Sequence, residues 1–193
     1  MGTFMNRVLR RMIFLFVALA LNGLGAGSAS ADQTDPRLPA LFQQLHDTGN
    51  LHTARLTELI IWKIWGETGQ PALDHLMAVG EAAMEKADFR TAEARFSAVI
   101  ARKPDFAEGW NRRATLYFLA GDYAASLADI EHVLELEPRH FGAISGLGVV
   151  NMALERHAAA RDAFERVLSL YPLNVSAQEN LKIAKKSLDD REI

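Results

Sequence analysis

Residues 104–138 read PDFAEGWNRRATLYFLAGDYAASLADIEHVLELEP, and this stretch decides the fold. It begins at Pro104 and ends at Pro138, and Pro172 follows after the same interval. Several other columns keep this step, among them Phe96, Ile130 and Phe164, then Val99, Val133 and Val167, and the small residues Gly80, Ala114 and Gly148. A period of this length indicates a repeat array, because each unit buries its apolar face only by stacking on its neighbour.

Each unit has the pattern of two amphipathic helices joined by a short turn. In the quoted unit the pattern predicts a first helix over roughly residues 106–119 and a second over roughly residues 123–136. Gly121-Asp122 breaks the pattern between them. Proline ends the second helix, because it cannot continue one. The sequence therefore predicts an all-α solenoid.

The 34-residue pattern resembles the tetratricopeptide repeat (TPR), whose units carry Trp, Leu-Gly, Tyr, Ala-x3-Phe and Pro in fixed order. The quoted unit matches this order with Trp110, Arg113-Ala114, Tyr117, Ser126-x3-Ile130 and Pro138. The flanking units keep Ala92-x3-Phe96 and Ala160-x3-Phe164, and both lack the Trp and the Tyr. The resemblance implies a right-handed α-solenoid with three repeats, at residues 73–106, 107–140 and 141–174.

The segments on either side of the repeats predict further helices. Residues 32–72 predict a divergent helical pair, whose second helix contains LTELIIWKIW and is apolar nearly all round, which favours burial on both sides. Trp62 falls in the Phe96 column, so we expect this pair to cap the N-terminal end of the array. Residues 175–193 predict a capping helix and a tail, and we expect residues 32–37 to be loose.

Residues 1–31 differ in composition from the rest of the chain. Arg7, Arg10 and Arg11 precede the apolar run MIFLFVALAL at residues 12–21, and small residues ending in Ala29-Ser30-Ala31 follow. This order is typical of a signal peptide that is cleaved before Asp32. An uncleaved membrane anchor, the alternative, needs about 20 apolar residues. We expect an exported, periplasmic protein with no stable membrane span after cleavage, and secretion is the alternative location.

Composition excludes several kinds of site. The chain has no cysteine, which rules out disulfides, cysteine-based zinc sites and thiol catalysis. Its 21 basic and 24 acidic residues show no basic excess of the kind that nucleic-acid binders carry. The six histidines have no metal-ligand spacing, and Gly142, Gly146 and Gly148 lie inside a predicted helix rather than after a strand. We expect no metal, cofactor or catalytic residue, and no enzyme activity.

The resemblance also implies a concave groove, lined by the first helix of each repeat, that binds a peptide or helix of another protein. By helical phase the groove residues are Asp74, Met77, Glu81, Met84, Glu108, Asn111, Thr115, Phe118, Ser145, Val149 and Met152. This set is acidic at its N-terminal end and apolar at its C-terminal end, which suits a partner segment with basic and apolar residues. Core packing is the alternative interpretation for the three methionines.

Some family members use the groove to hold the C-terminal carboxylate of a chaperone. Asn111 is well placed for that role, but Gly142, Ser145 and Gly146 stand where basic residues would be needed. We therefore predict a non-catalytic scaffold or adaptor in the cell envelope. The alternatives are an accessory subunit of an envelope enzyme complex and a self-associating structural protein, in which Trp62, Trp65 or the capping helix meets a second copy.

Overall fold

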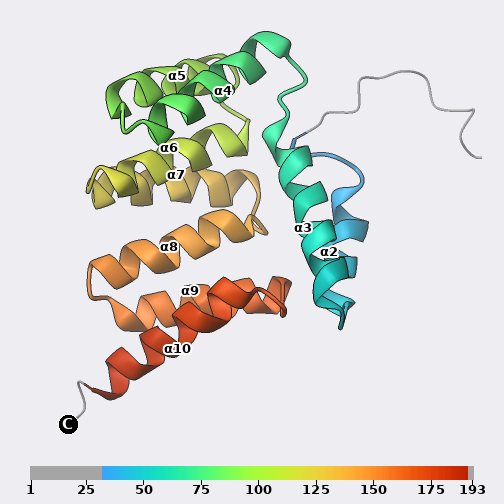
Figure 1. The fold of residues 1–193 in the computed structure, drawn as a ribbon, viewed down its shortest axis with the longest axis vertical. Helices are drawn as coiled ribbons and strands as arrows, with labels where there is room; N and C mark the ends of the chain where they lie inside the picture. The colour runs from blue at the N-terminus through green and yellow to red at the C-terminus, as the bar shows by residue number, and fades with distance from the viewer. Residues whose placement is uncertain (1–31, 191–193) are drawn as a thin grey trace, which may run out of the picture.

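Residues 32–190, the part of the chain that the computed structural model describes, form nine α-helices and no strand. Their bounds are α2 (Leu38–Asp47), α3 (Leu51–Gly66), α4 (Pro71–Glu85), α5 (Phe89–Arg102), α6 (Ala107–Leu119), α7 (Tyr123–Leu136), α8 (Phe141–Ala153), α9 (His157–Leu170) and α10 (Val175–Asp189). Helices α4 to α9 stack as three antiparallel pairs, and α10 packs on α9 (Figure 1). The all-α repeat solenoid predicted from the sequence is confirmed.

The turn inside each pair has the same backbone geometry. Two residues after the end of the first helix of a pair, one residue is in the left-handed region, with φ of 56° at Ala87, 81° at Gly121 and 56° at Glu155. In each case the N–H of the following residue donates to a carbonyl five positions back, as Asp122 does to Tyr117 at 2.9 Å. Only the middle repeat has glycine at this position. The other two repeats have residues with a side chain, which adopt the left-handed region at a cost in free energy.

The columns of the repeat form the core between helices. Val99, Val133 and Val167 have no exposed surface. The column of small residues at Gly80, Ala114 and Gly148 is needed for close packing of the two helices of a repeat. A Cβ added to Gly80 would lie 2.5 Å from Cε1 of Phe96. The same addition at Gly148 would lie 2.5 Å from Cε1 of Phe164. Glycine therefore allows the first helix of the repeat to contact the aromatic ring of the second.

The N-terminal helical pair does not cap the N-terminal end of the array, so that expectation was wrong. Helices α2 and α3 form a hairpin that lies beside the stacked pairs, across the ends of their helices (Figure 1). The hairpin shares an apolar cluster with α8, α9 and α10. Its tryptophans explain the placement, because Trp65 stacks on His140 at 4.1 Å between ring centroids and Trp62 meets Phe141 edge-on at 5.3 Å.

The segment before α2 is packed against the repeats, so the expectation of a loose segment was also wrong. Asp32 and Asp35 are each 2% exposed, and the Nζ of Lys103 lies 3.1 Å from Oδ2 of Asp32. The side chain of Gln33 donates to the carbonyl of Asp105 and accepts from the N–H of Ala107 at 3.3 Å. Gln33 thus caps α6, whose own N-cap residue supplies no side-chain hydrogen bond.

The predicted signal peptide lies outside the described residues. Within residues 32–190, no helix has the length and apolar character needed to cross a membrane.

Candidate functional site

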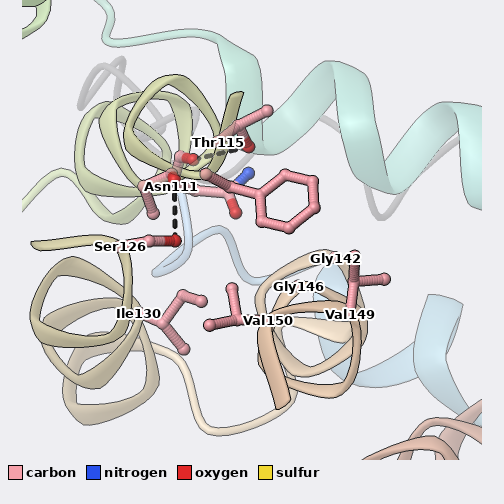
Figure 2. Close-up of a pocket in the computed structure, with 10 residues that line it drawn as sticks. Asn111, Thr115, Ser126, Ile130, Gly142, Gly146, Val149 and Val150 are labelled. Atoms are coloured by element: carbon pink, nitrogen blue, oxygen red, sulfur yellow. Dashed lines mark hydrogen bonds between the residues drawn. The ribbon is translucent and has the colours of Figure 1, made fainter. Parts of the chain in front are cut away.

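A hollow of about 190 Å³ lies between α6, α7 and α8 (Figure 2). Most of its wall is apolar, and the residues that line it are Asn111, Ala114, Thr115, Phe118, Ser126, Ile130, Gly142, Gly146, Val149 and Val150. Sites for whole small molecules start at about 300 Å³. The hollow is smaller than that, so it suits a single apolar side chain of a larger partner.

The polar side chains of the hollow are bonded to the protein itself. The Oγ of Ser126 donates to the carbonyl of Ala114 at 2.8 Å, and the Oγ1 of Thr115 donates to the carbonyl of Asn111 at 3.0 Å (Figure 2). The amide of Asn111 donates to Oε2 of Glu108 at 2.9 Å. The hollow therefore offers apolar contact and presents no nucleophile paired with a base.

Two glycines of α8 border the hollow, and they differ in what surrounds them. A Cβ added to Gly146 would meet only Cδ1 of Ile130, at 3.5 Å, which is an ordinary contact. A Cβ added to Gly142 would overlap the indole of Trp62, with Cζ2 at 2.9 Å and Cη2 closer still. Gly146 thus leaves the hollow wider, whereas Gly142 makes room for α3 at one end of it.

A chain of ion pairs connects α4, α6 and the start of α8. Glu108 is 1% exposed, and its Oε1 lies 2.7 Å from Nε of Arg112, which lies 3.1 Å from Oε1 of Glu81. His140, fully buried, has Nε2 3.1 Å from Oε2 of Glu108. Its Nδ1 accepts the N–H of Ala143 at 3.1 Å, so the ring proton lies on Nε2 and points to the carboxylate.

This chain of ion pairs has a structural consequence for the predicted groove. Glu81 and Glu108 both hold Arg112, so neither carboxylate is an isolated charge facing the solvent. His140 also forms the stack with Trp65. The same residues therefore fix the relative position of three elements, α3, α6 and α8.

A tyrosine that follows α9 holds the hairpin by a hydrogen bond to α3. The hydroxyl of Tyr171, which follows α9, donates to Oε2 of Glu58 on α3 at 3.1 Å. Tyr171 is 2% exposed. Burial, together with the neighbouring Glu58 carboxylate, raises the pKa of Tyr171 to about 12.

The structure brings together four of the residues predicted for the groove. Asn111, Thr115, Phe118 and Val149 line the hollow. The other predicted residues lie elsewhere: Met77 and Met84 pack on the cluster around Phe96, Met152 packs on the cluster around Phe164, Asp74 accepts from the N–H of Thr68 at 2.8 Å, and Ser145 is half-buried on α8. A binding role for any of these residues stays a prediction.

Helical phase also places Gly142 on the groove side, and five other lining residues were missed, namely Ala114, Ser126, Ile130, Gly146 and Val150. The space left by Gly142 and Gly146 together could have been found from the sequence. In the other two repeats the column of Gly142 holds Asp74 and Glu108, and the column of Gly146 holds Ala78 and Arg112. A loss of side chains in two columns on one side of a helix indicates space above that helix. In the described part of the chain, no group of three or more His, Asp or Glu residues is arranged to hold a metal ion.

Comparison with known proteins agrees with this architecture. The chain matches the family model described as tetratricopeptide repeat over residues 78–131 and 120–175. It is 38% identical over 152 residues to a TPR repeat-containing protein of Rhizobium etli, covering 79% of this chain and 74% of that protein. It is 32% identical over 114 residues to the Hsp70-Hsp90 organizing protein of Triticum aestivum, covering 59% of this chain and only 20% of that protein.

Solved structures show the same fold. One is the first TPR of Spaghetti (RPAP3) bound to the HSP90 peptide SRMEEVD, which is similar with a TM-score of 0.59 at 23% identity, over 61% of this chain and 93% of that chain. The periodic columns, the helix pairs and the similar proteins agree, and the chain belongs to the tetratricopeptide repeat family.

Proposed function

We propose that this chain is a non-catalytic protein-binding scaffold that holds a segment of another protein at the hollow between α6 and α8. The observation that carries the proposal is the apolar wall of Phe118, Ile130 and Val149 with Gly146 leaving one side bare. A partner side chain seated there gains apolar burial without displacing a bonded polar group. The peptide complex formed by the similar TPR domain supports this mode of binding.

The carboxylates of α4, a helix that contacts α6, favour a partner with basic and apolar residues. Glu85 is exposed at the end of α4, and the Glu81 side chain is 42% exposed. Arg112, the cation beside Glu81, is already held by Glu81 and Glu108. A partner that presents an apolar anchor with a lysine or arginine near it therefore meets complementary chemistry.

An acidic C-terminal peptide fits this surface poorly. Holding a terminal carboxylate takes converging cationic donors. At the start of α8 the chain has Gly142, Ser145 and Gly146, which supply none. SRMEEVD, the peptide of the similar structure, is accordingly expected to bind weakly or not at all.

We propose that the scaffold acts outside the cytoplasm, in the cell envelope. The support is the order of three arginines, ten apolar residues and Ala29-Ser30-Ala31 before Asp32. The intact mass of the protein recovered from the periplasmic fraction tests this location. A chain that starts at Asp32 agrees with the proposal, and a chain that is found only in the cytoplasm and still starts at Met1 contradicts it.

Binding is tested with a displayed library of random peptides and a variant in which the hollow is filled. Peptides selected on the protein are expected to share one apolar residue beside a basic residue. Gly146→Leu should weaken their binding about tenfold or more, because the added side chain occupies the space of the anchor. Ala94→Leu, an exposed position on α5, is the matched control. Selected peptides that bind Gly146→Leu as tightly as the original chain would exclude the hollow as the binding site.

A further inference from the structure

The outer face of α3 is apolar and faces away from the array. The helix packs inward through Ala54, Thr57, Ile61, Ile64 and Trp65, all buried. On its other side Leu56, Leu59 and Ile60 are 48%, 62% and 46% exposed. Arg55 and Lys63, both exposed, flank these three side chains. We call Arg55, Leu56, Leu59, Ile60 and Lys63 the outer stripe. It is basic at both ends and apolar between them.

A second hollow, larger than the first, lies between α7, α8 and α9. Its volume is about 470 Å³, and we call it the furrow. It is lined by Leu127, Ile130, Glu131, Leu134, Glu135, Leu147 and Arg166. Arg166 donates to the carbonyl of Pro138 at 2.5 Å, and His132 lies 3.5 Å from Glu135. The furrow therefore combines a leucine-rich floor with two exposed carboxylates, Glu131 and Glu135, on the α7 side.

The outer stripe and the furrow match in length and in charge. Leu56 and Lys63 are seven residues apart on α3, as Leu127 and Leu134 are on α7. At the helical rise each distance is about 10 Å. Leucine and isoleucine of the stripe would meet the leucine floor, and one basic end of the stripe would meet Glu131 and Glu135, which are four residues apart on α7. Pairing of two outer stripes is disfavoured, because their arginines and lysines would be brought together.

We propose that the outer stripe of one molecule docks in the furrow of a second copy. The contact is heterologous, so each molecule keeps one free stripe and one free furrow, and the contact repeats from copy to copy. The outer stripe has five residues and the furrow has seven, fewer than the roughly 20–30 residues on each side of a standard interface, so association is weak and depends on concentration. This contact does not use Trp62 or Trp65, which the sequence suggested for self-association. Trp65 is 1% exposed and Trp62 packs against Gly142.

The experiment measures self-association of the purified chain by sedimentation velocity over a wide concentration range. The original chain is expected to form species larger than a dimer as concentration rises. Leu59→Glu should weaken this association by placing a charge on the apolar stripe. The double variant Glu131→Lys with Glu135→Lys should weaken it by reversing the charge of the furrow. Each is expected to weaken association about tenfold or more. Leu119→Glu, at a leucine 53% exposed on α6, should have no effect.

Mixing the two defective variants distinguishes this interface from others. Leu59→Glu keeps an intact furrow, and the furrow variant keeps an intact outer stripe. An equimolar mixture is therefore expected to form a one-to-one dimer and nothing larger. A chain that is monomeric at every concentration overturns the proposal, and so does a mixture that stays monomeric. Association that Ile183→Glu on α10 abolishes and Leu59→Glu does not also overturns it, because the capping helix would then be the contact.

Discussion

Replacing the glycines of α8 by alanine one at a time is expected to change stability in different directions. The helix-propensity gain is the same at each position, about 0.8–1.0 kcal/mol in favour of alanine. At Gly146 the added Cβ would meet Cδ1 of Ile130 at 3.5 Å, an ordinary contact. Gly146→Ala is therefore expected to raise the free energy of unfolding by about 1 kcal/mol.

At Gly148 the same change produces an overlap. The Cβ would lie 2.5 Å from Cε1 and 2.6 Å from Cζ of Phe164, a ring with no exposed surface. The ring can escape only by moving into a packed core, and overpacking of this kind costs about 1–3 kcal/mol. Set against the propensity gain, Gly148→Ala is expected to lower the free energy of unfolding by up to about 2 kcal/mol.

At Gly142 the neighbour is Trp62, which is only partly buried and belongs to the α2–α3 hairpin. The hairpin can shift as a unit, so Gly142→Ala is expected to change the tryptophan fluorescence while the helix content stays the same.

Urea unfolding followed by circular dichroism at the helix band measures the first two effects. Gly80→Ala is a second test of the overlap argument, because its Cβ would lie 2.5 Å from Cε1 of Phe96 in the first repeat. If Gly148→Ala and Gly80→Ala are as stable as Gly146→Ala, close packing is not the reason for the glycine column, and the reasoning fails.

Three further predictions concern two turns, the segment before α2 and the hairpin. Ala87→Gly and Glu155→Gly should each stabilise the fold by about 1 kcal/mol in urea unfolding, because both residues have φ of 56°, and unchanged stability would contradict strain there. Gln33→Ala should lower the free energy of unfolding by about 1–2 kcal/mol through the lost cap on α6, and no loss would mean that the cap contributes nothing. The pKa of Tyr171 is about 12 in the folded state and about 10 in the unfolded state, so its contribution is complete below pH 10 and is lost between about pH 10 and pH 12. Tyr171→Phe should remove that part of the alkaline loss of stability, and equal losses in both chains would refute the assignment.

The repeat period predicted the solenoid well, since packing inside a repeat is encoded by residues that lie close together in the sequence. The helices expected over 106–119 and 123–136 are Ala107–Leu119 and Tyr123–Leu136 in the structure. The period also identified the columns of Phe96 and Gly80, and of Phe164 and Gly148, whose contact inside each repeat the structure shows. These contacts join neighbouring helices, and neighbouring helices of a repeat array nearly always pack on each other.

The position of the α2–α3 hairpin could not be read in the same way. Helical phase shows that α3 is apolar, but it does not show which surface α3 meets. Trp62 and Trp65 fit the columns of a preceding repeat, whereas in the structure they meet Phe141 and His140, which lie at the start of α8 and far away in the chain. The hollow was predicted in part, because phase places Asn111, Thr115 and Phe118 on one side of α6. Its missing side chains on α8 are visible only when the repeats are compared column by column.

The hairpin changes how the whole molecule is expected to unfold. An open repeat array has only neighbour contacts, so its ends can fray while its middle persists. Here the hydrogen bond between Glu58 and Tyr171 closes a loop of 113 residues, and it joins the beginning of the described chain to the end of the last repeat. The terminal repeats should then lose their amide protection together with the central one rather than before it. Docking of the hairpin should also be a late event in folding, because so long a loop closes only after the repeats bring its ends together.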